Sequence, residues 1–460
     1  MEETRNESPY SNGKDWISSL PDEIIHRIMS SNYIRDVVQT CVLSKRWIHI
    51  RKSVPCLSIK RSSFPLRREH DQRFIHFVDM VFILRNKSDI QRFAIIRYRY
   101  AIGEDIVMKN VYRWIVQAVK RNVKEMSLKI SQGHPEALEI PHQLVNCKSL
   151  VHLEMQVNFG FKCTDAMLPK SMDLPRLKVL WIHGVSIPNE ELSKRIFSSF
   201  PVLEKLFVYH CDIPNLTVNS LSLENFVYKR LPGSTDNVIK LTTPNLKYFQ
   251  CMSCVTQLYS LENCSLLFEV NFKLDLKERV LGENTEAYCN FLSHEEMVYA
   301  KHMTKFLREA CMVRNMWLSY GLLEVLSEAP DLLLDSEPPC LFNMLSFWMK
   351  MRFTRGCLWA ITYLLKISPR VQSILLYSKQ SNLVDVGDDW DAGLSSQRML
   401  SRLTDVSFYN VEGCDAKLKL LSFLLKHAKV LSNVRLSFRA STCSPDGVRK
   451  MELFLEKKSN

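Results

Sequence analysis

"LPRLKVLWIH" (residues 174–183) and "FPVLEKLFVY" (residues 200–209) share one pattern of apolar residues. An apolar residue is followed three positions later by a second, and two positions after that by a third, as in Leu177, Leu180 and Ile182. In an extended chain the second and third side chains point to one side, and the residue between them points to the other. The pattern therefore predicts a short strand with one buried face.

The same triple recurs along most of the chain. Because 46% of the residues are apolar, a random triple matches at roughly one position in ten, so the triples alone are weak. Most spacings, however, lie near the roughly 20–29 residues of a leucine-rich repeat. Four units also carry a proline two residues before the first apolar position, where a residue without an N–H suits the start of a strand. The twelve units begin at Val123, Leu150, Leu177, Leu203, Leu223, Leu246, Leu267, Val313, Met344, Val371, Leu403 and Leu431.

One such unit cannot bury its apolar face alone, so neighbouring units are expected to stack into a solenoid. This predicts an α/β fold in which a leucine-rich-repeat solenoid presents a curved parallel sheet, with helices or loops on the convex side. The spacings of 20 and 46 residues make Leu223 and the stretch after Leu267 the least regular parts of the series.

Three segments between the predicted strands favour helices. Residues 189–200 place Leu192, Ile196 and Phe197 on one face, and residues 358–368 end before a proline. Residues 293–310 begin with Ser293 and carry Glu296 three positions later, which is the spacing of a capping box.

Charge and cysteine content exclude several classes of protein. The 460 residues carry a net charge of +12, which favours acidic partners, and residues 45–73 hold nine Lys or Arg against two acids. That basic stretch is either a solvated rim beside a helix or an anion site. Fourteen cysteines at uneven spacings do not form a disulfide framework. Residues 1–14 read as a disordered tail without the apolar core of a signal peptide, and no apolar run is long enough to span a bilayer. We therefore expect a reduced, intracellular protein of the nucleus or cytoplasm, or both.

Signals for chemistry are weak. Cys251 and Cys254, with Cys264 ten residues on, form only half of a zinc motif, and Cys251 fills an inward strand position. No phosphate loop, dinucleotide fingerprint or metalloprotease motif is present, so neither catalysis nor a cofactor nor a metal is expected. Residues 92–102 interleave Arg with Tyr, as some nucleic-acid binders do, but the alternation fits a strand at a solenoid edge better, with Ile96 on one face and Arg97 on the other.

The N-terminal segment differs from the repeats and predicts three short helices. In the first, Leu20, Ile24 and Ile28 recur every four residues, Ile25 widens the stripe, and Pro21 suits the first helical position. A second helix holds Val38 and Val42, and Ser44 caps a third that contains Trp47 and Ile48. Three helices of this size make a thin core. Their apolar excess calls for a partner, either the solenoid or another protein.

The residues of this segment resemble a known motif. "LPDEII" (residues 20–25), "RDVVQTCVLSKRW" (residues 35–47) and "KSVP" (residues 52–55) are similar to the F-box of plant ubiquitin-ligase substrate receptors. Residues 111–128 look like the first repeat of plant F-box proteins with leucine-rich repeats, and residues 403–438 resemble their C-terminal FBD module. The resemblance implies a tail at 1–14, an F-box at 15–55, irregular repeats at 56–400 and an FBD-like module at 401–456 that continues the solenoid.

By this resemblance, the F-box docks on a Skp-type adaptor that links it to a cullin scaffold, and the repeats hold a protein substrate for ubiquitination and degradation. The chain is then a non-catalytic subunit of a Skp–cullin–F-box ubiquitin ligase. Leu20, Ile24 and Val42 have an alternative place in the core of the three-helix unit or against the first repeat. The positions implied for adaptor contact are Leu20, Pro21, Ile24, Ile28, Val38, Val42 and Trp47.

One part of the motif departs from the family. Between the first two helices, where the family usually has an apolar Phe-Leu-Pro, this chain has Ser31, Asn32 and Tyr33. Because burying a large apolar side chain is worth roughly 1.5–3 kcal/mol, the change predicts weaker adaptor docking, partly offset by Tyr33 and Ile34.

Substrate contact is expected at the outward residues of the strands, where aromatic side chains are frequent and suit binding hot spots. A register slip of one residue would place them in the core instead. Two other functions remain open: a ligand-gated receptor with a small-molecule or inositol-phosphate pocket, for which only Lys205 and Lys350 stand centrally, and a scaffold with a weakened F-box. The predicted substrate-binding residues are Trp181, Phe207, Tyr209, Trp317, Trp348 and Tyr377.

Overall fold

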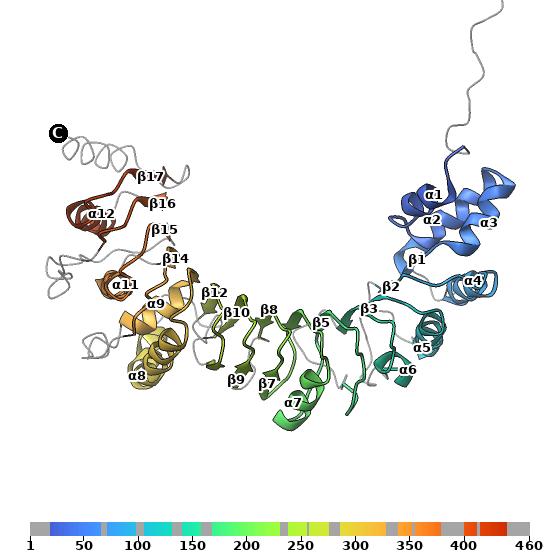
Figure 1. Ribbon diagram of the computed structural model, residues 1–460, viewed down its shortest axis with the longest axis horizontal. Coiled ribbons are helices and arrows are strands. Elements are labelled where there is room, and N and C mark those ends of the chain that lie inside the picture. Colours follow the sequence, from blue (N-terminus) through green and yellow to red (C-terminus); the bar gives the residue numbers. More distant parts are fainter. Residues whose placement is uncertain are drawn as a thin grey trace, which may run out of the picture. The chain divides into compact units, whose positions relative to one another are not determined.

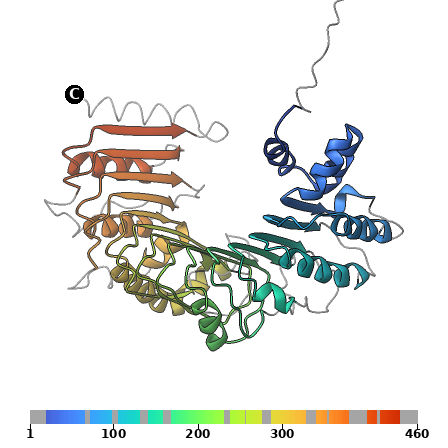
Figure 2. The ribbon, with the colours of Figure 1, turned by 45° about the vertical axis from the view of Figure 1, so that its right-hand side comes forward.

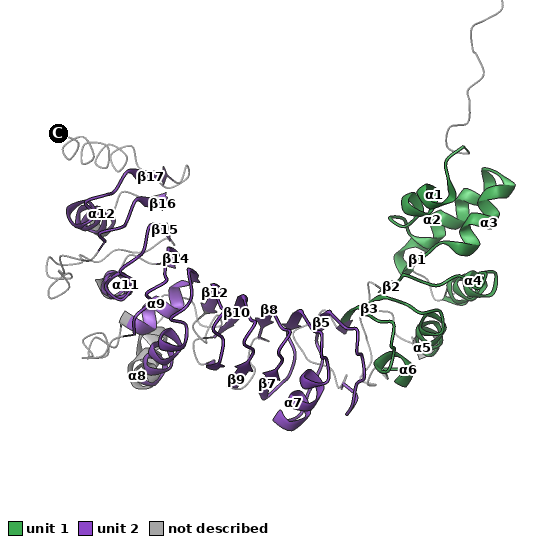
Figure 3. Cartoon of the chain, in the orientation of Figure 1, with its two compact units in different colours: residues 1–134, 139–155 green, residues 135–138, 156–460 purple. Residues whose placement is uncertain are grey.

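The structure is a computed structural model in which the chain forms two units, each built of parallel strands and covering helices (Figures 1 and 3). Unit 1 comprises residues 1–134 and 139–155, and unit 2 comprises residues 135–138 and 156–460. The structure describes residues 19–65, 71–97, 105–130, 140–157, 168–230, 238–254, 257–275, 286–327, 339–351, 355–378, 400–411 and 415–438.

Unit 1 begins with the predicted three helices and continues into four parallel strands in the order β1-β2-β3-β4. The helices α4 and α5 connect successive strands. The elements are α1 (Asp22–Met29), α2 (Ile34–Gln39), η1 (Thr40–Val42), α3 (Lys45–Ser53), β1 (Cys56–Lys60), η2 (Arg61–Ser63), α4 (Asp71–Ile83), β2 (Arg92–Arg97), α5 (Asp105–Val119), β3 (Glu125–Ile130), α6 (His142–Val145) and β4 (His152–Val157).

The repeats start earlier than the twelve predicted units. The strands β1 and β2 precede the first of those units and pair in parallel, Leu57 with Phe93. Both carry the apolar triple, so the sequence held a signal that the threading missed. β2 also lies between β1 and β3, so the expectation of an edge strand at residues 92–102 is wrong, and residues 98–102 lie outside the described ones. The overlooked triples are Val54, Leu57, Ile59 and Ile90, Phe93, Ile95.

Unit 2 holds ten of the predicted repeat strands in one parallel sheet, ordered β5-β6-β8-β10-β12-β13-β14-β15-β16-β17. The orange-to-red arrows of Figure 2 show the last of these lying side by side. With the predicted strands β3 and β4 of unit 1, all twelve units form strands, which confirms the leucine-rich-repeat fold. The strands are β5 (Val179–His183), β6 (Lys205–Tyr209), β8 (Asn225–Lys229), β10 (Tyr248–Cys254), β12 (Glu269–Asp275), β13 (Asn315–Leu318), β14 (Ser346–Met351), β15 (Ser373–Ser378), β16 (Asp405–Val411) and β17 (Asn433–Phe438).

A second, three-stranded parallel sheet covers the middle repeats of unit 2 and was not predicted. It consists of β7 (Asn215–Asn219), β9 (Val238–Thr242) and β11 (Leu258–Glu262). These strands lie in the repeats whose spacings are 20, 23 and 21 residues. A helix rises about 1.5 Å per residue and a strand about 3.3 Å, so a helix needs about twice as many residues to cross the same width. In the shortest repeats, the segment that covers the main sheet is therefore a strand and not a helix.

In longer repeats, the segment that covers the main sheet is a helix. The predicted helix at 189–200 is confirmed as α7 (Glu190–Ser198): Leu192, Ile196 and Phe197 are buried, and the Leu192 N–H donates to Asn189 Oδ1 at 2.9 Å. The capping box at Ser293 is wrong, because the helix begins seven residues earlier and Ser293 lies inside it. The helices of unit 2 after α7 are α8 (Glu286–Glu309), α9 (Tyr320–Ser327), α11 (Arg355–Lys366) and α12 (Asp415–His427).

The core of unit 2 lies between the strands and these covering elements. Phe249 on β10 packs against Phe226 and Phe272 on the adjacent strands, each with ring centroids 5.6 Å apart. Phe272 in turn contacts Phe306 of α8 at 4.3 Å, and Tyr259 of β11 lies 5.1 Å from Phe272. Aromatic pairs of this kind contribute roughly 0.5–1.5 kcal/mol each beyond their burial. The inward residues of the triples therefore determine which face of the sheet packs against the covering helices and strands and which face points away from them.

Candidate binding surfaces

Helix α1 divides its apolar residues between two directions. Ile25 and Met29 are buried, whereas Ile24 is 43% and Ile28 is 50% exposed. The single stripe expected from the sequence is therefore wrong: the two exposed residues point away from the core that the two buried ones enter. Arg46 of α3 pairs with Asp22 at the start of α1, and its guanidinium donates to the Leu20 carbonyl at 2.6 Å. These bonds fix α1 on α3.

The following helices repeat this division. Ile34, Val37, Trp47 and Ile50 are buried, while apolar side chains of η1, its C-cap and α3 face outward. Val42 is 88% exposed, an extreme value for an aliphatic residue. We call the outward-facing residues of α1, η1 and α3 the exposed aliphatic set. The set consists of Ile24, Ile28, Val42, Leu43 and Ile48.

The seven positions implied for adaptor contact fall into three groups. Ile24, Ile28, Val42 and Pro21 are exposed, and Leu20 and Val38 are half-buried. Trp47 is only 5% exposed, so in this structure it is a core residue. Leu43 and Ile48 were not among the residues predicted for adaptor contact. The break between η1 and α3 directs their side chains outward, and the sequence pattern does not show this break.

The core alternative for Ile24 and Val42 is wrong, since both are exposed, but the segment does pack on the first repeat through α2. Ile34 and Val37 are buried on that side. Lys60 of β1 lies over the Tyr33 ring with its Nζ 4.7 Å from the centroid, and Arg35 lies over Phe64 at 5.0 Å. Within unit 1, the three helices thus use one side for the repeats and expose another.

Three of the nine cations in the basic stretch at residues 45–73 are engaged within unit 1. Arg46 pairs with Asp22, and Arg61, which is buried, donates to Asp71 at 2.6 Å and to the Pro65 carbonyl at 3.0 Å. Lys60 lies over Tyr33, as above. Of these three cations, Lys60 links the three helices to the first repeat, Arg46 joins α3 to α1, and Arg61 joins η2 to α4.

The unusual polar residues after α1 close the end of that helix. Ser31 Oγ and Asn32 Nδ2 donate to the Ile28 carbonyl at 2.9 and 3.2 Å, and Ser30 Oγ donates to the His26 carbonyl at 2.6 Å. Ser31 and Asn32 are exposed. The last carbonyl groups of a helix have no intrahelical partners, so these polar side chains accept that role at the end of α1 by donating to its carbonyls. In exchange, these positions expose less apolar surface to a partner.

A second candidate surface is the face of the unit 2 sheet that none of the described helices and strands covers. The outward residues of adjacent strands are in register, so Trp181 pairs with Phe207, and Trp317 pairs with Trp348. The predicted register is confirmed, because the flanking inward residues, such as Leu180 and Ile182, are buried.

The aromatic side chains of this face form clusters of stacked rings. Trp181 stacks on Phe207 at 5.2 Å with an interplanar angle of 30° and contacts Tyr209 edge-on at 5.2 Å. Trp317 and Trp348 lie 4.2 Å apart. Trp317 is 39% exposed, so this ring remains available although it is packed. Tyr377, on the same face, stacks on its neighbour Tyr409 at 5.9 Å.

Near the first cluster lie two histidines. The rings of His183 and His210 are 5.2 Å apart in an edge-to-face arrangement. Burial, followed by the nearby Lys229 and His183, lowers the pKa of His210 to about 4. His210 is therefore neutral at neutral pH, and it sits in the left-handed backbone region with φ of 48°.

Cys251 is a core residue, as predicted from its inward position. Its Sγ lies 3.3 Å from the Tyr259 hydroxyl, and burial raises the pKa of this thiol to about 12. Cys264 instead faces Thr243 Oγ1 at 3.5 Å. Within the described ranges no three His, Cys, Asp or Glu side chains gather as metal ligands, and none of the helices there combines the length and apolarity needed to cross a membrane.

Comparisons with known proteins show what the chain is similar to. Residues 111–265 match the family model described as FBD-associated F-box protein At5g56370, LRR repeats. The chain is 29% identical to a putative F-box/LRR-repeat protein of Arabidopsis thaliana, At3g58880, over 79% of this chain and 77% of the relative. It is 28% identical to the F-box/LRR-repeat protein At4g14103, over 79% and 92%, and 25% identical to the F-box/FBD/LRR-repeat protein At1g78750, over 97% and 93%, both from the same plant.

Proposed function

We propose that this chain, which is 25–29% identical to plant F-box/leucine-rich-repeat proteins over most of its length, is the substrate-recognition subunit of a Skp–cullin–F-box ubiquitin ligase. Its three N-terminal helices bind a Skp-type adaptor, and the uncovered sheet face of unit 2 binds a protein substrate. The chain itself performs no chemistry. It raises the effective concentration of a substrate lysine near the transferring enzyme.

The observation that carries this proposal is the exposed aliphatic set. Ile24, Ile28 and Val42 are 43%, 50% and 88% exposed, whereas Ile25 and Met29 of α1 are buried. Burying one such side chain is worth roughly 1.5–3 kcal/mol. A partner that covers the set gains enough to offset the cost of association, which is at least about 4 kcal/mol. Isolated exposed apolar residues are common, but a group on adjoining helices marks an interaction site.

Co-purification with a plant Skp-type adaptor tests the proposal. The wild-type chain should bind, and Ile24→Asp/Ile28→Asp should abolish binding, because two carboxylates would be desolvated in the interface. Ile83→Asp is the matched control, since Ile83 is 70% exposed at the end of α4 in the same unit. Equal thermal melting of all three proteins excludes unfolding as the cause. A wild-type chain that does not bind the adaptor contradicts the proposal.

A ligand-gated receptor is the second candidate, and one observation favours it. The sequence placed only Lys205 and Lys350 centrally on the sheet face, but Lys229 and Lys273 are also exposed there. Inositol hexakisphosphate should then raise the melting temperature of the wild-type chain and leave that of a Lys229→Gln/Lys273→Gln variant unchanged. No shift in the wild type contradicts this second function.

A further inference from the structure

The sheet face of unit 2 carries two aromatic clusters separated by polar strands. Cluster A consists of Trp181, Phe207 and Tyr209 on β5 and β6, and cluster B of Trp317 and Trp348 on β13 and β14. Three strands, β8, β10 and β12, lie between them in the sheet. Both clusters belong to unit 2, and their rings are packed against one another but only half-buried or exposed.

The register between the clusters sets a length. Neighbouring strands carry Phe207, Val227, Gln250, Asn271 and Trp317 in direct register, which makes four steps from one cluster to the other. At about 4.8 Å per strand, the separation is about 19 Å. An extended chain advances about 3.3 Å per residue, so it spans this distance in about six residues.

The floor between the clusters suits an extended backbone. Val227 is buried, and Gln250 and Asn271 present half-buried amides. Asn271 Oδ1 is buried and accepts no hydrogen bond from the described part of the chain. The half-buried amide side chains of Gln250 and Asn271 provide polar groups along the path of a bound peptide backbone, whose N–H and C=O groups need hydrogen-bond partners. A helical ligand satisfies its own N–H groups, so an extended one fits better.

Two lysines lie beside this floor. Lys229 on β8 and Lys273 on β12 are exposed at the carboxyl ends of their strands, with Met252 of β10 between them. Neither ammonium group forms an ion pair with a described carboxylate. Glu269 lies on the other side of the floor, at the amino end of β12. Anionic side chains of a ligand are therefore favoured on the lysine side.

We propose that this face binds an extended peptide segment with two large apolar side chains about six residues apart and acidic residues between them. The apolar side chains pack on clusters A and B, and the acidic ones approach Lys229 and Lys273. The inference rests on the proposed function, because it specifies the class of substrate that the receptor takes.

The experiment measures binding of labelled synthetic peptides to the full-length chain by fluorescence anisotropy. The first peptide has seven residues, with tryptophan at both ends, glutamate at the third and fifth positions, and serine elsewhere. One control replaces both glutamates by glutamine, and another shortens the peptide so that the tryptophans lie three residues apart. The first peptide should bind about tenfold more tightly than either control. Equal affinities, or no binding at all, overturn the proposal.

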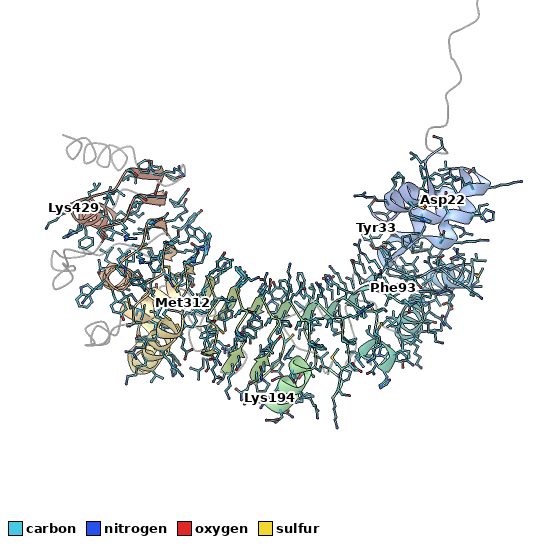
Figure 4. All side chains as sticks on the ribbon, viewed as in Figure 1. Asp22, Tyr33, Phe93, Lys194, Met312 and Lys429 are labelled. Carbon is cyan, nitrogen blue, oxygen red and sulfur yellow. The ribbon has the colours of Figure 1, made fainter. Side chains whose placement is uncertain are left out.

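Variants locate the site. Lys229→Gln/Lys273→Gln should erase the preference for glutamate over glutamine, and Trp181→Ala or Trp317→Ala should each weaken binding about 30-fold. Lys194→Gln is the matched control, because Lys194 is exposed on α7, on the covered side of the sheet (Figure 4). Peptide binding that survives both tryptophan substitutions overturns the assignment.

Two further measurements distinguish the peptide site from the ligand-gated receptor and from the proposed ligase role. Inositol hexakisphosphate that binds through the same lysines, while no peptide binds, favours the ligand-gated receptor and overturns the peptide site. Adaptor co-purification of the same preparation reports on the proposed function by itself. An adaptor-binding chain that ignores the peptides contradicts only the further inference, and a chain that binds the peptides but not the adaptor contradicts only the ligase role.

Discussion

The helices of unit 1 and the sheet face of unit 2 both expose apolar side chains, but the two surfaces are built differently. The exposed aliphatic set consists of side chains such as Val42, at 88% exposure, that project from short helices into solvent. The aromatic residues of the sheet face are packed against one another before any ligand arrives, as Trp317 is against Trp348. The apolar side chains of the first surface are removed from water only when a partner binds. The second is already ordered.

This difference bears on what each surface can recognise. Aliphatic side chains on helices favour any partner of complementary shape, so they suit one constant partner. Rings packed in fixed positions, beside two lysines, discriminate between ligands by spacing and charge. This contrast matches the two roles proposed above for the surfaces, adaptor docking and substrate binding.

The largest expected effect concerns the three helices. Trp47→Ala should lower the free energy of unfolding of unit 1 by about 3–5 kcal/mol, because Trp47 is buried at 5% exposure. Ile48→Ala, one residue away and 36% exposed, should cost less than about 1 kcal/mol. Urea denaturation followed by circular dichroism measures both. If Trp47→Ala lowers the free energy of unfolding as little as is expected for Ile48→Ala, Trp47 is not a core residue.

The two faces of the unit 2 sheet should differ in the same way. Phe272→Ala should cost about 3–5 kcal/mol of unfolding free energy, because Phe272 is 0% exposed and touches Phe249, Tyr259 and Phe306. Trp317→Ala should cost about 1 kcal/mol, the worth of one ring pair. Thermal and urea denaturation give the values. A Trp317 loss as large as that of Phe272 would make cluster B structural, and the comparison of the two surfaces would fail.

The polar residues after α1 offer a gain of function. Ser31→Phe/Asn32→Leu should raise adaptor affinity about tenfold, because two exposed polar side chains are replaced by apolar ones in the region that the family fills with apolar residues. The loss of two bonds to the Ile28 carbonyl tempers the gain. Calorimetric titration with the adaptor measures the change. Unaltered or weaker affinity would place this link outside the interface.

The smallest expected effect is a pH dependence near cluster A. The pKa of His210 is lowered to about 4, so the unfolded chain takes up a proton at this residue before the folded one does. The stability that neutral His210 contributes is present above pH about 6.5 and is lost as pH falls toward 4. His210→Asn, which tolerates the positive φ, should reduce that loss by less than about 1 kcal/mol, since the ring is half exposed. Urea denaturation of both proteins at pH 7.5 and 5 tests this, and identical pH dependence contradicts it.

The repeat triples predicted the sheet of unit 2 well, because an apolar spacing of three and then two is read directly from the sequence. Leu180 and Ile182 are buried and Trp181 faces outward, as the period of two requires. The candidate residues of the sheet face followed from the same rule. The rule missed Lys229 and Lys273 as a charged pair, because only the sheet order reveals that one strand separates them.

The sequence by itself determined the twelve predicted repeat strands, the leucine-rich-repeat fold, and the position of the helical N-terminal motif, since these depend on local periodicity and on short strings. Tertiary structure alone decided that Ile25 is buried while Ile24 is exposed, that Trp47 enters the core, and that short repeats cross with β7, β9 and β11 instead of helices. Two adjacent isoleucines have the same hydrophobicity. Their directions differ because helix packing, which joins α1 to α3 through Arg46 and Asp22, fixes the rotation of α1.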